Sequence, residues 1–456
     1  MPITIMGFIY IILLLYFAFY KNNSEIKIIT TVLISSLLID LGYVINIGGF
    51  MIDYYEFGIV FYIIYILFIN RKKRTVNISE LYFLLFFILF LISSFYYNFI
   101  FELSRNTLIK PTSVGFDDLA INRNLLTHPS FNQGNIKSII GITFFLIFIV
   151  LSHKQIVSNI KYITDKIILF MKVEFLLIFT EFFINLINPT LSRSIINQLF
   201  GIRNSQVVEV RPRFFYNAFG TFSEPSHIAF FLFVFFNIYF LYSSDHKAKR
   251  YLWLLLGFII GILSGSTSAF FISFYGLFVG YIININFYKF IKLSVWILIS
   301  ILAFSFFYYY SVDFNQMVNW NFRRLIGFFT LENINGTSEV GRMGSIIQAY
   351  NAGIENPIFG VFIGSTNATG FIPTIFSNIG LLGSFLYLYL LKILFNLTFL
   401  KKFTLVIIYL ILLNFIGQLN MIYSPVMIVL LLPFMDEKII NKEVRYEKNK
   451  YNYTHA

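Results

Sequence analysis

The sequence has no cysteine, so the chain forms no disulfide and carries no thiolate nucleophile or thiolate metal ligand. Charged residues are also scarce: they make up 12% of the 456 residues, whereas 58% are hydrophobic. A soluble domain of this length and balance would aggregate, so lipid is the expected solvent for most of the chain. No stretch is long enough for a separate soluble domain. We therefore expect an all-α polytopic integral membrane protein, with residues 1–456 forming a single membrane domain.

Apolar runs of about 17 to 20 residues, the length that crosses a hydrocarbon core as a helix, recur along the chain. They predict about 12 to 13 transmembrane helices. The first run has no basic leader and no small-residue cleavage site, so we interpret it as a retained span and not as a signal peptide. The candidate spans lie near residues 3–20, 28–50, 53–69, 81–100, 136–152, 167–187, 227–242, 250–263, 269–285, 293–310, 370–391, 403–418 and 421–435.

Lysine and arginine are sorted between the two faces of these spans. Lysine-rich connectors fall on alternate sides, together with the tail at 436–456, and the positive-inside rule makes that side the cytoplasm. Cytoplasmic segments then hold 18 of 21 lysines but only 4 of 13 arginines. Residues 102–135 form one outer loop, and 188–226 and 311–369 form two large extracytoplasmic loops. The nine outer arginines are Arg105, Arg123, Arg193, Arg203, Arg211, Arg213, Arg323, Arg324 and Arg342.

The outer arginines run against the positive-inside rule, which predicts few cations outside. A guanidinium grips phosphate or carboxylate through a bidentate fork and stays charged when it is desolvated. Our hypothesis is that these arginines bind an anion. The alternative is that they pair with lipid headgroups or with carboxylates of their own loops. Those carboxylates are Glu102, Asp117, Asp118, Glu209, Glu332 and Glu339.

The loop at 188–226 ends in a cluster of reactive side chains directly before an apolar span. Arg211 and Arg213 precede Glu224, and His227 follows it. Pro225 suits the first turn of a helix, so Glu224 is expected at the mouth of that membrane helix. Glu224 is the strongest candidate base in the chain, and a helix-capping carboxylate is the alternative. His227 could share the role of base or only hydrogen-bond a neighbouring loop.

The loop at 311–369 predicts a short helix that carries an arginine. Ser338 can cap its start, and Gly353 with Asn356-Pro357 can close it. Arg342 would then be exposed in the first turns, on a rigid platform parallel to the membrane.

Three other polar features precede or follow that helix. Backbone amides of Gly360, Gly364, Ser365 and Thr366 could approach a phosphate closely. The small polar turn at 264–268 suits either helix packing or a cavity lining. Within the span at 167–187, Glu174 and Glu181 share a helix face, and ionisable groups at membrane depth are functional suspects, with Asp40 and Lys172 as their candidate partners.

Sites for nucleotides and metals are missing. No Walker or dinucleotide glycine pattern occurs, and the cytoplasmic connectors are too short to fold around ATP. The outer segments carry no Asp-x-Asp or His-x-x-x-His pattern, although Asp117-Asp118 is an adjacent carboxylate pair. We therefore expect no metal, no cofactor and no nucleic-acid partner. The energy for any reaction must come with the substrate.

Three segments together resemble, in order, spacing and sidedness, the pattern of bacterial O-antigen and capsular polysaccharide polymerases, a family related to O-antigen ligases. They are Gly220-x-Phe222-x-Glu224-Pro225-Ser226, the Ser-Thr-Ser turn at 266–268, and Arg342 followed eleven residues later by Gly353 and then by Asn356-Pro357-x-x-Gly360. The likeness is best over residues 211–391. It implies a GT-C-like helical fold in the bacterial cytoplasmic membrane.

The resemblance also implies a reaction, the transfer of glycan from an undecaprenyl-diphosphate-linked donor to another lipid-linked repeat in O-antigen or capsule assembly. Arg211, Arg213 and Arg342 would neutralise the diphosphate leaving group, and Glu224 would accept the acceptor proton, with His227 as the alternate. Displacement by one base opposite the leaving group would be inverting and metal-independent. Arg203, Arg323 and Arg324 are further candidates for diphosphate contact, and a chain-length regulator is a candidate partner.

The sequence departs from the pattern at two places, and two other functions stay open. Thr267 stands where ligase-like relatives often have arginine, and Arg211 lies nine residues before Gly220. An O-antigen ligase tends to carry a histidine in its last large outer loop, and 311–369 has none. A flippase or transporter often contains internal repeats, and none is visible here.

Overall fold

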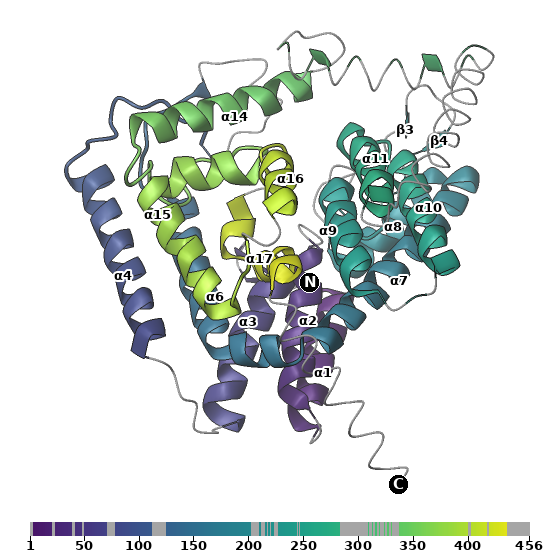
Figure 1. The fold of residues 1–456 in the computed structure, drawn as a ribbon, viewed down its shortest axis with the longest axis horizontal. Coiled ribbons are helices and arrows are strands. Elements are labelled where there is room, and N and C mark those ends of the chain that lie inside the picture. Colours follow the sequence, from purple (N-terminus) through teal and green to yellow (C-terminus); the bar gives the residue numbers. More distant parts are fainter. Residues whose placement is uncertain are drawn as a thin grey trace. The chain divides into compact units, whose positions relative to one another are not determined.

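The computed structural model describes residues 3–20, 23–38, 42–47, 50–70, 78–111, 125–201, 227–243, 247–282, 337–399, 403–416 and 419–435, with short pieces at 209–210, 215–216, 218, 220–222 and 245 and isolated positions between 309 and 330. This part of the chain is mostly helical (Figure 1). It also has two small antiparallel hairpins, β1 (Tyr43–Ile47) with β2 (Phe50–Asp53) and β3 (Glu209–Val210) with β4 (Phe215–Tyr216). The chain forms two compact units: unit 1 is residues 1–9, 37–53 and 165–336, and unit 2 is residues 10–36, 54–164 and 337–456.

Unit 1 is built around α9 (His227–Tyr242), whose side chains from residue 227 to residue 239 are all buried. A helix that is hydrophobic all round belongs inside a bundle. The ring of Phe236 lies against Gly257 and Gly276, where an added Cβ would come within 3.0 Å and 2.3 Å of it. These glycines let α9 approach its neighbours. The other helices of unit 1 are α7 (Ile160–Ile187), which begins five residues before the unit, α8 (Pro189–Phe200), α10 (Lys247–Leu263) and α11 (Thr267–Ile282).

Unit 2 is organised by α15 (Phe371–Phe395), which packs against α4 (Ile78–Phe95), α6 (Gln133–Ser158) and α14 (Thr337–Glu355). Asn132 caps α6, since its side chain accepts from the backbone N–H of Gly134 at 2.8 Å and of Asn135 at 3.3 Å. The remaining elements are α3 (Tyr54–Ile64), η1 (Tyr65–Ile69), η2 (Tyr96–Ile100), α16 (Phe403–Leu413), η5 (Leu419–Tyr423), α17 (Val426–Leu431) and η6 (Leu432–Phe434). The residues of α1 (Ile5–Phe19) and α2 (Ser24–Leu37) are divided between the two units.

Most predicted spans are helices in the structure. The span predicted at 227–242 coincides with α9 at both ends, and those at 81–100 and 136–152 lie within α4–η2 and α6. Among the described helices, three are long and apolar enough to cross a membrane: Glu80–Ile100, Gln133–Ser158 and Phe371–Phe395. Shorter apolar helices are Ile5–Phe19, Tyr54–Ile69 and His227–Tyr239. The predicted span at 293–310 and the tail at 436–456 lie outside the described residues.

The prediction of one helical span over 28–50 is wrong. The helix α2 ends at Leu37, and β1 begins at Tyr43. Gly42 has a φ of +136°, and an added Cβ would lie 2.1 Å from the carbonyl oxygen of Phe200, so a helix cannot continue through it. Beyond it, the β-branched residues Val44, Ile45 and Ile47 favour a strand. The local glycine and the branched side chains outweigh the apolar character of the run.

The run at 421–435 also differs from one continuous helix. It consists of the end of η5, the six-residue helix α17 and the short 3-10 turn η6. Pro425 precedes α17 and Pro433 lies inside η6, and each proline lacks the N–H that a continuous helix needs. All described side chains from 421 to 435 are nevertheless buried, so this segment is core of unit 2.

Candidate functional site

Three of the eight predicted site residues lie in the described part of the chain. They are His227, Arg323 and Arg342. The other five, Arg203, Arg211, Arg213, Glu224 and Arg324, lie outside the described residues. Arg323 is exposed. His227 is buried and is the first described residue of α9, so a helix does follow the motif, whereas Pro225, the predicted first-turn residue, lies outside the described residues.

The two glutamates of α7 bind the backbone of the motif that precedes α9. Oε1 of Glu174 accepts hydrogen bonds from the backbone N–H and the hydroxyl of Thr221, at 2.7 and 2.9 Å. Oε2 of Glu181 accepts from the backbone N–H of Gly220 at 2.6 Å. Both carboxylates are buried, with 1% and 2% of each residue exposed. The shared helix face that the seven-residue spacing predicts is therefore directed at residues 220–221.

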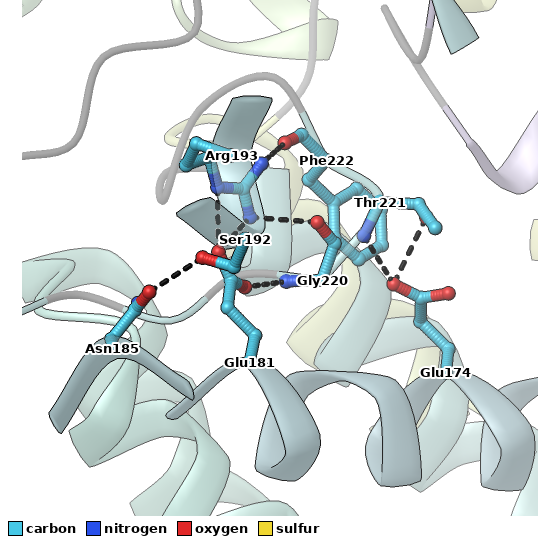
Figure 2. A network of polar contacts seen from close by, with 8 residues as sticks. All are labelled: Glu174, Glu181, Asn185, Ser192, Arg193, Gly220, Thr221 and Phe222. Carbon is cyan, nitrogen blue, oxygen red and sulfur yellow. Dashed lines mark hydrogen bonds and ion pairs between the residues drawn. The ribbon is translucent and has the colours of Figure 1, made fainter. Parts of the chain in front are cut away.

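Arg193 on α8 completes this arrangement from the other side (Figure 2). Its Nε donates to Oε1 of Glu181 at 2.6 Å, Nη1 donates to the carbonyl of Phe222 at 2.9 Å, and Nη2 donates to the carbonyl of Gly220 at 2.7 Å. Ser192, its neighbour, donates to Asn185 near the end of α7 at 2.5 Å. We call Glu174, Glu181 and Arg193 the 220–222 clamp.

The motif residues suit this site for steric reasons. Gly220 has a φ of +59°, and an added Cβ would lie 2.2 Å from Oε1 of Glu174, so no other residue fits without a shift. Phe222 is 1% exposed, and its ring meets that of Phe231 on α9 edge to face with centroids 5.1 Å apart. Two residues before Gly220, the N–H of Ala218 donates to the carbonyl of Leu263 at 3.0 Å. The segment is thus tied to α7, α8, α9 and α10.

Electrostatics explain why Arg193 pairs inside the protein. Burial lowers the pKa of its guanidinium from the usual value, while the charges of Glu181 and Glu174 oppose that shift. Because three of its nitrogens are directed at protein acceptors, Arg193 is placed to hold the chain and not an external anion. Arg105 is likewise paired, with Glu102 at 3.0 Å, and both side chains are exposed. The pairing alternative therefore holds for Arg105, whereas Arg193 pairs with Glu181, a carboxylate of α7 that the alternative did not include.

The predicted arginine helix of the third outer loop is confirmed as α14 (Thr337–Glu355). Arg342 lies in its first turns and is partly buried, not fully exposed as predicted. No carboxylate among the described residues pairs with its guanidinium. Its backbone carbonyl accepts from the hydroxyl of Ser345 at 2.7 Å, and that hydroxyl in turn accepts from the N–H of Thr369 at 3.3 Å. The helix that carries Arg342 is therefore hydrogen-bonded to the loop that contains Thr369.

Gly353, Asn356 and Gln348 fix α14 to other parts of unit 2. An added Cβ on Gly353 would lie 2.5 Å from the ring of Phe376 on α15, so the glycine permits this close crossing. Asn356, at the end of α14, donates to the hydroxyl of Thr107 at 2.8 Å. Gln348 joins the same two segments, since it accepts from the N–H of Lys110 and donates to the carbonyl of Leu108, both at 2.8 Å.

The prediction of a phosphate-binding backbone at 360–366 is wrong, because the amides are used inside the protein. The N–H of Gly360 donates to Asn356 at 2.9 Å, and that of Gly364 donates to the side chain of Asn378 at 2.9 Å. The N–H groups of Ser365 and Thr366 donate to Phe362 and Asn378. All these residues are buried. No free amide donor is left in this set for a ligand.

The Asn356-Pro357-x-x-Gly360 motif supports a broken helix. The helix α15 is interrupted at Gly380, which has φ 61° and ψ −169°. The carbonyl of Pro357 accepts from the N–H of Leu381 at 2.7 Å, and that of Ile358 accepts from Leu382 at 3.3 Å. The motif thus caps the second half of α15, whose first N–H groups have lost their helical partners.

The polar turn at 264–268 serves helix packing and capping. Of its two predicted roles, helix packing and cavity lining, the structure supports helix packing. The hydroxyl of Ser266 accepts from the N–H of Ala269 at 3.3 Å, at the start of α11. An added Cβ on Gly261 would lie 1.7 Å from the hydroxyl of Ser273, so α10 and α11 are in tight contact there. Thr267 is the first residue of α11.

Sequence reasoning missed several residues that build these sites. Lys172 pairs with Asp245 and not with the glutamates of α7, and Asp40 lies outside the described residues. The neutral anchors Thr107, Asn135, Gln348 and Asn378 carry no local motif. Among the described residues, no group of three or more His, Cys, Asp or Glu is arranged to hold a metal ion. Comparison of the chain with protein-family models, with curated proteins and with solved structures found no match.

Proposed function

We propose that this chain is a multi-pass protein of the bacterial cytoplasmic membrane, with about 12 to 13 spans, that polymerises lipid-linked glycan repeats at the outer face. Three helices of spanning length and further apolar helices support the membrane part. On α1 and α4, large apolar side chains such as Phe8, Ile12 and Phe86 are about half exposed, as lipid-facing residues would be. A GT-C-like fold and the polymerase activity are supported by the sequence pattern over 211–391.

One observation carries the proposal more than any other: Arg342 is partly buried, and no carboxylate among the described residues pairs with its guanidinium. Its helix is held by glycine contact to α15 and by the Asn356–Thr107 hydrogen bond. A guanidinium on such a fixed helix, with no carboxylate partner among the described residues, suits the diphosphate of a lipid-linked donor at the outer face, because the planar fork matches two phosphate oxygens.

The proposed reaction uses this charge on the leaving group. The hydroxyl oxygen of an acceptor sugar forms a bond to the anomeric carbon of the donor, and the bond from that carbon to the diphosphate oxygen breaks. The electron pair leaves with the undecaprenyl diphosphate, whose growing charge Arg342, Arg211 and Arg213 stabilise. Arg203, Arg323 and Arg324 supply the surrounding positive field. Glu224 takes the hydroxyl proton, with His227 as the alternate base.

The test compares two outer arginines in a strain that lacks the gene. Arg342→Ala should give surface glycan with a single repeat, whereas Arg105→Ala should restore the full ladder of chain lengths on a gel. Arg105 is the matched control because it lies on an outer loop but is already paired with Glu102, with 75% of its side chain exposed.

Two other results would speak against polymerisation. A normal ladder from Arg342→Ala, with the protein present at the wild-type level, would remove the diphosphate role of this residue. Loss of all surface glycan on deletion of the gene would favour a ligase, which joins glycan to another acceptor, or a flippase, which moves the lipid-linked substrate across the membrane.

A further inference from the structure

We propose that the 220–222 clamp is a positioning device for the catalytic segment and that Arg193 is a positioning residue, not a ligand of the donor diphosphate. The inference rests on the proposed function, because the segment it positions leads directly to Glu224 and His227. Arg193 belongs to the nine outer arginines that the charge pattern marks as anion binders. Its contacts separate it from that group.

The clamp binds an unusual share of the backbone of three consecutive residues. The N–H and the carbonyl of Gly220, the N–H of Thr221 and the carbonyl of Phe222 all bond to its side chains. The bonds come from α7 on one side and from α8 on the other (Figure 2). Residues 220–222 can therefore neither slide nor rotate without breaking a charge-assisted hydrogen bond.

By holding residues 220–222, the clamp restrains the short segment that leads to Glu224, the candidate base. Glu224 follows Phe222, the last clamped residue, by only two residues in the sequence. Beyond it, His227 begins the buried helix α9, which fixes the other end of the segment. A base must lie within hydrogen-bond reach of its proton, and a misplacement of about 1 Å lowers turnover by roughly a hundredfold.

The chemistry of the clamp requires arginine. Its planar fork reaches one carboxylate and two carbonyls at once, at 2.6, 2.9 and 2.7 Å. A lysine ammonium is a single point and cannot hold all three acceptors in these directions. Arg193→Lys keeps the charge and should lose the geometry.

A kinetic experiment distinguishes positioning from binding. Wild-type protein, Arg193→Lys and Glu181→Gln would be reconstituted in nanodiscs and supplied with lipid-linked repeats. We expect turnover to fall by about a hundredfold, while the half-saturating donor concentration stays close to the wild-type value. Lys172→Met is the matched control, because Lys172 forms another ion pair from α7, with Asp245, and should leave turnover unchanged. A raised half-saturating concentration with unchanged turnover would make Arg193 a donor ligand and overturn the inference.

A second experiment does not depend on the activity. Because the chain has no cysteine, Ala218→Cys introduces a single thiol into the anchored segment, at a residue that is fully buried. Maleimide labelling of this thiol should be about tenfold faster, or more, when Glu181→Gln is added, since a broken buried pair favours local opening. Lys172→Met should leave the rate unchanged.

Equal labelling rates with and without Glu181→Gln would show that the clamp does not hold the segment and would overturn the inference. A wild-type protein that does not polymerise would instead overturn the proposed function. The labelling result would then still decide whether the clamp holds residues 220–222.

Discussion

Two segments that the sequence singles out, one in each unit, are held in different ways. In unit 1, residues 220–222 are bound by charged side chains, the carboxylates of Glu174 and Glu181 and the guanidinium of Arg193. In unit 2, residues 356–366 are bound by neutral groups, chiefly the amides of Asn378 and Asn135 and the backbone of α15. Residues 220–222 and residues 360–366 are all buried, so the difference between these stretches lies in charge and not in access to solvent.

The two solutions place different demands on the sequence. A charged clamp tolerates an irregular backbone because it can bond to it from several directions, but each charge needs its partner in low dielectric. Neutral groups leave no buried charge without a partner. The segment that they hold must, however, adopt its conformation without charge-assisted hydrogen bonds. Accordingly, the segment in unit 2 has positive φ at Gly360, Phe362 and Gly364, whereas the clamped residues of unit 1 have it only at Gly220. Charged side chains at residues 220–222 and positive-φ residues at 356–366 thus both stabilise an irregular backbone.

The largest expected effect comes from removing one charge of the unit 1 clamp. Arg193→Met leaves Glu181 buried without its cation, so the free energy of unfolding should fall by about 3 to 5 kcal/mol. The double variant Arg193→Met/Glu181→Leu removes both charges and should lose clearly less than the sum of the single variants. Denaturant unfolding of purified protein in detergent would measure the cycle. Additive losses would mean that the pair is not coupled, and the contrast between charged and neutral clamps would fail.

A smaller effect is expected from the glycine that breaks α15. Gly380→Ala should lower the free energy of unfolding by about 2 to 4 kcal/mol, because φ is 61° and an added Cβ would lie 2.4 Å from the carbonyl oxygen of Ile358. Gly344→Ala is the control: this residue lies inside α14, and an added Cβ meets nothing within 4 Å. It should raise stability by up to about 1 kcal/mol. Equal effects would show that the break at Gly380 does not depend on glycine.

Elements with local signals could be predicted from the sequence. The apolar run at 227–242 predicts α9, and Asn356-Pro357 predicts the end of α14, although Ser338 and Gly353 lie inside that helix and not at its ends. Capping and termination depend on neighbours along the chain, so a sequence pattern is enough to find them. The same local reasoning treated 28–50 as one helix, although Gly42 and the branched residues after it oppose this.

Partners that depend on tertiary packing could not be predicted. The shared face of Glu174 and Glu181 was visible, but their partners lie 12 to 47 residues away and on other elements. The same holds for Asn356 with Thr107, which are 249 residues apart. A buried polar group must find a partner, but the sequence does not say which one. The arginine sorting therefore could not separate Arg193, which holds the chain, from Arg342, which no described carboxylate pairs.

The contacts of Asp245 test whether charged hydrogen bonds in unit 1 still stabilise the fold where water has partial access. Asp245, with 15% of its side chain exposed, accepts from Lys172, from Tyr239 at 2.9 Å and from Lys249 at 3.1 Å. Burial alone would raise the pKa of Asp245, but these hydrogen bonds outweigh it and hold the pKa well below the usual value of 3.8. Stability from this carboxylate is therefore fully present above pH 3.8 and is lost as the pH falls through the lowered value.

The smallest of the three predicted losses of stability follows from the lowered pKa of Asp245. Asp245→Asn should lower the free energy of unfolding by about 1 to 3 kcal/mol at pH 7 and by the same amount near pH 5, because the wild-type carboxylate stays ionised over that range. The difference from wild type should shrink only below about pH 4. Lys249→Met is the control, since 57% of the lysine side chain is exposed, and its effect should stay within about 1 kcal/mol. A difference that already shrinks between pH 7 and pH 5 would mean that the pKa of Asp245 lies above its usual value, so that its burial outweighs its hydrogen bonds.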